Sequence, residues 1–282
     1  MKRLTKIFVN LLAVLLIGTA CFGTAGCVEK ITTLDVKVQV YNYTAEEMQE
    51  VTLKVNLYGH LAKKTVDRVI SYAKKGFYNN NVFYKMNGTT SQIGSTNQIM
   101  LGDIVDDDGV AMTKNIFPTI KGEFERNGVA GSNLVNEKGV IGLWRSWYEN
   151  SNYNTNETSM DSGKATWYIP TSTISSYNDW FCVFAKIDLE DEETANALDL
   201  ITKAFDETTE KYTVYYTGEY DESKANENHG LKGNVVKSVD FDESDYFKAE
   251  GAQLVCYNKQ EISVAMHDGE VAAKILSISV GK

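Results

Sequence analysis

Proline, histidine and cysteine are scarce in this chain of 282 residues. It has 2 prolines, 3 histidines and 4 cysteines, against 16 tyrosines and 21 glycines. The histidines (His60, His229 and His267) are scattered and no Cys-x-x-Cys motif is present, so we expect no metal site. The shortage of proline together with many tyrosines and glycines favours a protein built mainly of strands and turns.

The chain also lacks an excess of basic residues. It has 28 lysines and arginines against 38 aspartates and glutamates, which gives a formal net charge of −10. A protein that binds nucleic acid needs a basic face for the phosphate backbone, so nucleic acid is excluded as a partner. An acidic, solvated surface is instead typical of an exported protein.

The N-terminus has the pattern of an export signal. Three basic residues lie within the first six positions, and an apolar segment follows from Ile7 to Ile17. This segment is too short to span a bilayer comfortably, whereas it suits the apolar region of a signal peptide. We therefore expect residues 1–26 to lie outside the folded domain.

The signal ends in Thr24-Ala25-Gly26-Cys27, which resembles the lipobox of bacterial lipoproteins. The resemblance implies that Cys27 carries a lipid and that residues 27–33 are a short tether. The location that follows is extracytoplasmic, on the cell membrane. An ordinary secretory signal with an incidental cysteine remains the alternative.

Two further cysteines, Cys182 and Cys256, lie in the predicted domain. Outside the cytoplasm they could form a disulfide. Two buried free thiols are the alternative, because cysteine is often a small core residue.

Alternation and helical spacing place several elements in the predicted domain, residues 34–282. Alternating apolar residues at 34–40 and again at 51–57 predict a hairpin, and an apolar stripe predicts a helix that ends before Gly76. A second helix is expected to begin at the acidic residues 190–193, and Asp268-Gly269 predicts a tight hairpin turn. We expect loop insertions at about 87–98, 104–118, 146–163 and 218–250.

Short motifs along the chain resemble, in the same order, segments of the cyclophilin family of peptidyl-prolyl cis-trans isomerases. The motifs are Gly76-Phe77-Tyr78, Val82-Phe83-Tyr84-Lys85, Ile99-Met100-Leu101-Gly102-Asp103, Ile120-Lys121-Gly122-Glu123-Phe124, Lys138-Gly139-Val140-Ile141-Gly142-Leu143-Trp144, Thr166-Trp167-Tyr168-Ile169 and Val183-Phe184-Ala185-Lys186-Ile187. The resemblance runs from about Val36 to the C-terminus. It implies a mainly β fold with two helices, a closed antiparallel eight-stranded β-barrel capped by helices.

The resemblance also implies a chemistry. An isomerase of this family lowers the barrier to rotation about an X–Pro bond, about 18–20 kcal/mol uncatalysed, and needs no nucleophile or cofactor. Its site holds the proline ring in an apolar pocket and directs a cation at the prolyl nitrogen. At the matching positions, Lys85 replaces the catalytic arginine, and Met100 replaces a glutamine.

The expected pocket is completed by Tyr168, at the position of a pocket phenylalanine, and by Phe181, at the position of the histidine that closes the pocket. Trp144 replaces a small alanine where the substrate backbone lies. Ser176 falls at the position of a pocket tryptophan, and Tyr177 or Trp180 are alternatives for that space.

The sequence therefore predicts a lipid-anchored, extracytoplasmic isomerase-like protein, a monomer that assists the folding of exported proteins. Its partners would be proline-containing peptides or unfolded exported proteins. We expect weak activity because both the arginine and the glutamine are replaced. Two alternatives remain: a non-catalytic peptide-binding module on the same scaffold, and a surface adhesin or assembly factor acting through acidic loops.

Overall fold

The computed structural model describes residues 31–87, 97–113, 118–129, 134–146, 155–217, 232–242 and 257–281. The chain divides into two units, residues 1–31 and 32–282, and the elements below belong to the second. The predicted signal peptide, Cys27 and Cys256 lie outside the described residues.

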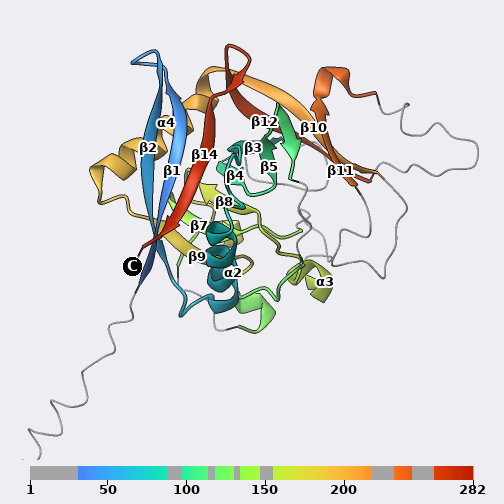
Figure 1. Ribbon diagram of the computed structural model, residues 1–282. Helices are drawn as coiled ribbons and strands as arrows, with labels where there is room; N and C mark the ends of the chain where they lie inside the picture. The colour runs from blue at the N-terminus through green and yellow to red at the C-terminus, as the bar shows by residue number, and fades with distance from the viewer. Residues whose placement is uncertain are drawn as a thin grey trace, which may run out of the picture. The chain divides into compact units, whose positions relative to one another are not determined.

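Within the described residues, the fold is mainly antiparallel β with three α-helices (Figure 1). The helices are α2 (Lys63–Lys74), α3 (Glu157–Met160) and α4 (Glu192–Glu207). The strands are β1 (Thr32–Asn42), β2 (Glu47–Leu57), β3 (Tyr84–Asn87), β4 (Gln98–Leu101), β5 (Ile104–Asp106), β6 (Val110–Met112), β7 (Val140–Leu143), β8 (Trp167–Pro170), β9 (Cys182–Ile187), β10 (Thr209–Thr217), β11 (Lys232–Lys237), β12 (Tyr257–His267), β13 (Glu270–Val271) and β14 (Ala273–Val280). The sequence predicts two of these helices, and α3, which is only one turn long, is the addition.

The described strands form one twelve-stranded sheet and a separate two-stranded sheet, β5–β6. The order in the large sheet is β11-β10-β12-β3-β4-β8-β7-β9-β2-β1-β14, with β13 paired to β12. Because this order is an open path and contains more than eight strands, the closed eight-stranded barrel stays a prediction.

The segment before β3 contacts β14, the strand at the end of the sheet. The Asn80 N–H donates to the Ile275 carbonyl at 2.8 Å, and the Ile275 N–H donates to the Asn81 carbonyl at 2.8 Å. The Phe83 N–H donates to the Ala273 carbonyl at 3.2 Å. Residues 80–83, which lead directly into β3, are therefore hydrogen-bonded to β14.

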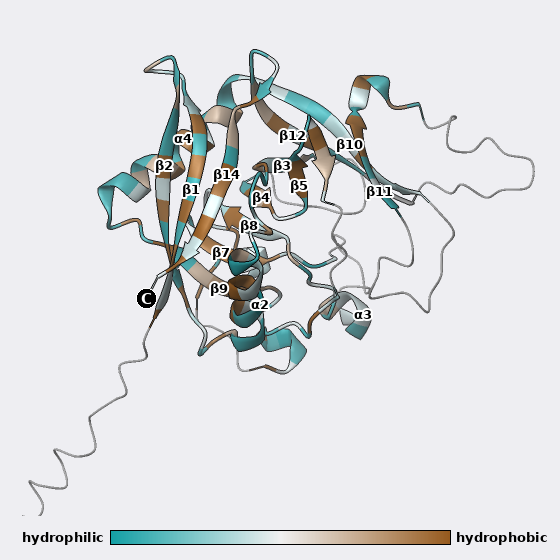
Figure 2. Cartoon of the chain, viewed as in Figure 1, coloured by the Kyte–Doolittle hydropathy of each residue, from teal (hydrophilic) through white to brown (hydrophobic). Residues whose placement is uncertain are grey.

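The first hairpin has the register that its alternating pattern predicts. β1 and β2 pair along their whole length, with Val36 opposite Leu53 and Val38 opposite Val51. Their apolar residues point to one side and their polar residues to the other, which appears as bands of brown and teal (Figure 2). The predicted hairpin is confirmed.

Both long helices end or begin where their capping residues require. Gly76, just beyond α2, has φ of 68°, a left-handed conformation that favours glycine. At the start of α4, the Asp191 carboxylate accepts a hydrogen bond from the Thr194 N–H at 2.9 Å. The predicted positions of both helices are confirmed.

The turn between β12 and β13 also follows the prediction. Asp268 and Gly269 have φ of 50° and 85°, and two successive positive values are typical of the type I′ turn. A predicted tight hairpin is therefore present near the C-terminus.

Three of the predicted loop insertions contain regular structure. The segment 104–118 holds the β5–β6 hairpin, 146–163 holds α3, and 218–250 holds β11. Short polar strands such as β11 give a weak hydropathy pattern, so the sequence predicts loops at these positions.

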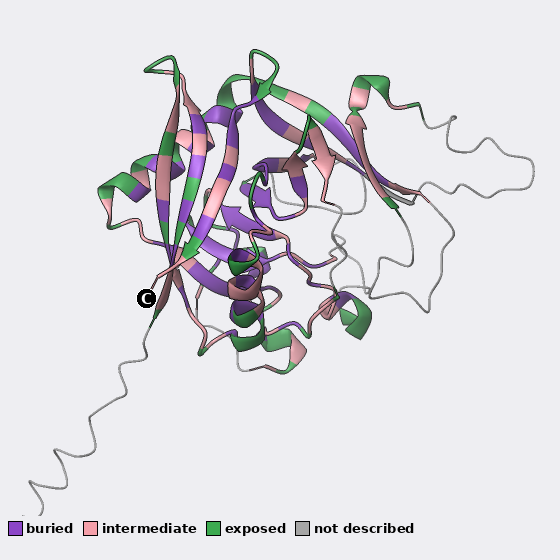
Figure 3. Cartoon of the chain, in the orientation of Figure 1, coloured by how far each residue is buried: buried purple, intermediate pink, exposed green. Residues whose placement is uncertain are grey.

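Two hydrophobic cores lie on opposite sides of the sheet. Side chains alternate along a strand, so neighbouring residues such as Ile99 and Met100 enter different cores. The first core includes side chains of α2 and α4, and the second includes side chains of β10 and β12. Strands β7, β8 and β9 are accordingly almost continuously buried (Figure 3).

The Cys182 thiol is buried in the first core. It lies 3.4 Å from the Thr65 hydroxyl oxygen, and burial raises the pKa of this thiol to about 12. Since Cys256 lies outside the described residues, the pairing of the two cysteines stays a prediction.

Candidate functional site

One row of side chains crosses five strands on the same face of the sheet. The strand registers pair Val264 with Tyr84, Tyr84 with Met100, Met100 with Tyr168, and Tyr168 with Gly142. Directly paired residues on neighbouring strands point to the same face. Met100 and Tyr168, both predicted pocket residues, therefore lie side by side in the second core.

Aromatic rings gather at one end of this row. The Trp144 ring stacks on Phe181 with centroids 5.4 Å apart, and Tyr168 meets Phe181 edge-on at 5.4 Å. The Tyr177 ring lies 4.4 Å from Phe181. We call Trp144, Tyr168, Tyr177 and Phe181 the aromatic cluster. The structure thus brings Met100, Tyr168, Phe181 and Trp144 together, and their role as a substrate pocket stays a prediction.

Water reaches only the margin of this cluster. The exposed fractions of Met100 and Tyr168 are 0%, and that of Phe181 is 3%. Trp144 and Trp180 are partly exposed. The residues expected to line an open pocket are therefore packed against one another, and the two tryptophans form the accessible rim.

Tyr168 is held in a single position by its surroundings. Its hydroxyl donates a hydrogen bond to Asn136 Oδ1 at 2.6 Å. A Cβ atom at Gly142 would lie 2.1 Å from the Tyr168 ring, so only glycine fits beneath it. Burial raises the pKa of the Tyr168 phenol well above its usual value, and the group stays neutral.

The position expected for a pocket tryptophan is filled by a neighbour in sequence. Ser176 is exposed, whereas Tyr177 is buried in the aromatic cluster. Of the two alternatives for this space, Tyr177 is the residue that packs into the cluster. Trp180 lies at the rim.

Lys85 lies apart from the aromatic cluster. Its neighbours Tyr84 and Met86 point into the second core, so alternation turns Lys85 to the opposite face of β3. There its ammonium lies 5.0 Å from the centroid of the Phe205 ring on α4. The structure does not bring Lys85 to the other predicted site residues, and its catalytic role stays a prediction.

A polar group beside the second core was not predicted. The Tyr84 hydroxyl donates to Asp103 Oδ1 at 2.8 Å. Burial raises the pKa of the Asp103 carboxyl, while hydrogen bonds from Tyr84 and Thr166 act in the other direction. Burial also lowers the pKa of Lys164, against the attraction of Asp103. In the sequence, Gly102-Asp103 stands out only as part of a motif, and no local pattern connects it with Lys164.

A buried cation also lies against the aromatic cluster. The Arg145 side chain is 3% exposed, and its guanidinium carbon lies 5.2 Å from the centroid of the Phe181 ring. Arg145 Nε donates to the Trp180 carbonyl at 2.9 Å, and Nη1 donates to Ser159 Oγ at 2.9 Å. These bonds fix the loop that carries Trp180. The sequence signal was a lone arginine directly after Trp144.

Within the described residues, no group of three or more histidine, cysteine, aspartate or glutamate side chains could hold a metal ion. In the same part of the chain, no helix has the length and apolar character needed to cross a membrane.

The family model for cyclophilin type peptidyl-prolyl cis-trans isomerases matches residues 43–219 of this chain. The match covers well over half of the sequence, and the chain therefore belongs to this family. No curated protein sequence matches it. The matched region begins after β1 and ends before β11, so it leaves out β1 and the strands from β11 to β14.

Solved structures of the family are similar to this chain at low identity. A cyclophilin type isomerase from Cryptosporidium parvum has 15% identity over 60% of this chain and 85% of its own, with a TM-score of 0.38. The same protein in the presence of the dipeptide Ala-Pro has 17% identity over 58% of this chain and 84% of its own, with a TM-score of 0.35.

Proposed function

We propose that this protein is an extracytoplasmic, lipid-anchored peptidyl-prolyl isomerase-like protein that binds proline-containing segments of exported proteins and isomerises them weakly. Membership of the cyclophilin family supports the substrate class. The aromatic cluster carries the proposal for the site, because a proline ring packs well against aromatic rings and the rim tryptophans Trp144 and Trp180 are accessible.

Weak activity follows from the groups available to act on the prolyl nitrogen. The family's glutamine is replaced by Met100, which is fully buried and lacks a hydrogen-bond donor. Lys85 retains a positive charge but not the planar fork of arginine. In its described position it faces Phe205, so it would have to cross to the other side of β3 to act on a substrate at the cluster.

We also propose that the sheet closes into the barrel typical of the family. The hydrogen bonds between residues 80–83 and β14 support closure, because they join the end of the sheet to the strand before β3. A closed barrel removes the exposed strand edges at the junction. The protein would act as a monomer.

The alternative is a non-catalytic module that binds peptides at the same rim. A specific observation favours it: Met100 and Tyr168 are fully buried, so a substrate ring cannot replace water in a pre-formed pocket. Binding would then depend on the partly exposed Trp144 and Trp180 without the transition-state contacts that catalysis needs. The adhesin hypothesis has no comparable support among the described residues.

The test is isomerase activity of the full chain on an Ala-Pro test peptide, with binding of the same peptide measured in parallel. We expect slow turnover that falls at least tenfold in Trp144→Ala, since this variant removes an accessible ring against which the proline packs. Lys85→Ala is compared with Lys37→Ala, an exposed strand lysine that lies on β1. A loss specific to Lys85→Ala supports the catalytic prediction.

Binding without turnover would replace the isomerase with the non-catalytic module. If the wild-type chain shows no binding and no turnover, the isomerase and the non-catalytic module are both contradicted. The location has a separate test, since Cys27→Ser should abolish incorporation of radiolabelled palmitate and release the protein from membranes. Retention of the label in Cys27→Ser would contradict lipidation at this residue.

A further inference from the structure

Half of strand β2 has an edge without a partner strand. β1 pairs with one edge of β2 over its whole length. On the other edge, among the described strands, β9 pairs with Val55–Leu57 alone. In the part of the chain that the structure describes, no strand pairs with this edge from Glu47 to Leu53.

The backbone direction at this edge follows from Lys54. Its N–H donates to Thr194 Oγ1 at 3.3 Å and its carbonyl accepts from the Asp188 N–H at 2.9 Å, both on the side away from β1. In an antiparallel pair, alternate residues direct both groups to the same edge. Thr52, Glu50 and Met48 therefore direct their N–H and C=O groups outward, over a length of about 13 Å.

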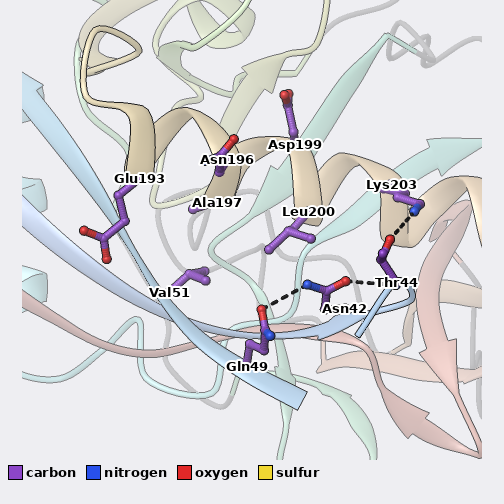
Figure 4. Close-up of a pocket in the computed structure, with 10 residues that line it drawn as sticks. All are labelled: Asn42, Thr44, Gln49, Val51, Glu193, Asn196, Ala197, Asp199, Leu200 and Lys203. Carbon is purple, nitrogen blue, oxygen red and sulfur yellow. Dashed lines mark hydrogen bonds between the residues drawn. The ribbon is translucent and has the colours of Figure 1, made fainter. Parts of the chain in front are cut away.

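A hollow of about 490 Å³ lies beside this edge, between the β1–β2 hairpin and α4 (Figure 4). Val51, Ala197 and Leu200 point toward its middle, and Glu193 lies at one end (Figure 4). An added strand would alternate its side chains between this hollow and the opposite face. The hollow therefore offers space for apolar side chains of a partner.

The charges near the edge favour a basic partner. Glu47, Glu50 and Glu193 are exposed. The charge of Lys54 is offset by its ion pair with Asp191. Lys203 keeps its charge and donates to Thr44 Oγ1 at 3.1 Å, so the three glutamates outnumber it. A second copy of the chain paired through the same edge would bring these glutamates opposite one another, which costs free energy.

We propose that the Met48–Thr52 edge binds an extended, basic segment of another protein, which adds to the sheet as an antiparallel or parallel strand. Main-chain hydrogen bonds supply the affinity, and alternate apolar side chains enter the hollow beside α4. The site lies away from the aromatic cluster and does not depend on isomerase activity.

The test uses the full chain and an acetylated, amidated eight-residue peptide of alternating lysine and valine, titrated by calorimetry. Thr52→Pro removes one outward N–H and should leave the ladder with β1 intact, because the N–H of Thr52 does not face β1. Thr52→Val is the matched control and keeps the N–H. We expect Thr52→Pro to weaken binding about tenfold and Thr52→Val to bind within about twofold of wild type.

A second pair of variants tests the charge. Glu193→Gln should weaken binding, and lowering the salt concentration should strengthen the remaining binding less than it does in wild type. Glu192→Gln changes an exposed neighbour on α4 and should have neither effect. A glutamate–valine peptide of the same length should bind at least tenfold more weakly than the lysine–valine peptide. Circular dichroism and melting temperature show whether each variant is folded.

Equal binding to Thr52→Pro and Thr52→Val, or binding that Trp144→Ala abolishes, would overturn the proposed site. A dimer of the wild-type chain that Thr52→Pro converts to monomer would assign the edge to a second copy and overturn the proposed partner. Since Thr52 does not belong to the aromatic cluster, isomerase activity should be the same in Thr52→Pro and wild type. The failure of one proposal is thus separable from the failure of the other.

Discussion

The two cores on either side of the sheet differ in chemistry although they share the same strands. The first core is packed by two amphipathic helices, and beyond Thr194 in its first turn the buried residues of α4 are apolar, as at Leu198 and Ile201. The second contains several phenols and is bordered by ionisable groups, among them Tyr84, Asp103 and Lys164. The difference suggests that the first core mainly stabilises the fold, while the second combines stability with the candidate site.

The largest effect is expected in the first core. Trp167 is 1% exposed, and its indole N–H donates to the Tyr78 hydroxyl at 3.1 Å. Trp167→Ala should lower the free energy of unfolding by about 3–5 kcal/mol, since it leaves a cavity and an unpaired hydroxyl. Urea unfolding measures this, with Met100→Ala in the second core as the comparison. A cost for Trp167→Ala below that for Met100→Ala would contradict the proposed division of roles.

A smaller effect is expected where the second core is tightest. Gly142→Ala would place a Cβ 2.1 Å from the Tyr168 ring, and overpacking of this kind costs about 1–3 kcal/mol. The displaced ring should also lower peptide binding at the rim. Adding Tyr168→Leu should recover part of the stability, because the smaller side chain frees the space. If Gly142→Ala melts at the wild-type temperature, the two residues do not pack as closely as described.

The smallest effect concerns pH and the polar border of the second core. Burial raises the pKa of Asp103 above its ordinary 3.8, so the folded state binds this proton more tightly than the unfolded state. The contribution of Asp103 to stability is therefore largest at low pH and falls as pH rises through its raised pKa. Unfolding at several pH values should show this decline in wild type and not in Asp103→Asn. Identical profiles would contradict the burial of this carboxyl.

The elements of the first core were predictable because their patterns are local. The β1–β2 hairpin alternates strictly, α4 begins at acidic residues, and Asp268-Gly269 dictates a tight turn. The match of several short motifs in order also predicted the family. Each of these signals lies within about a dozen neighbouring residues.

The side of the sheet on which Lys85 lies could not be predicted in the same way. The strand around it is apolar at Phe83, Tyr84 and Met86, so hydropathy gives no alternation from which to assign its faces. Both faces are apolar because each faces a core. A resemblance to the family's arginine identifies the position of Lys85 along the chain, but not the direction of its side chain.

The sequence by itself determined the cyclophilin family and the main strands and helices, because local patterning and motif order encode them. Only the tertiary structure decided that Met100 and Tyr168 are buried, that Lys85 faces Phe205, and that Arg145 and Asp103 border the second core. These outcomes depend on strands from distant parts of the chain, such as β12 beside β3. Burial and side-chain direction arise from such contacts, and no short stretch of sequence contains them.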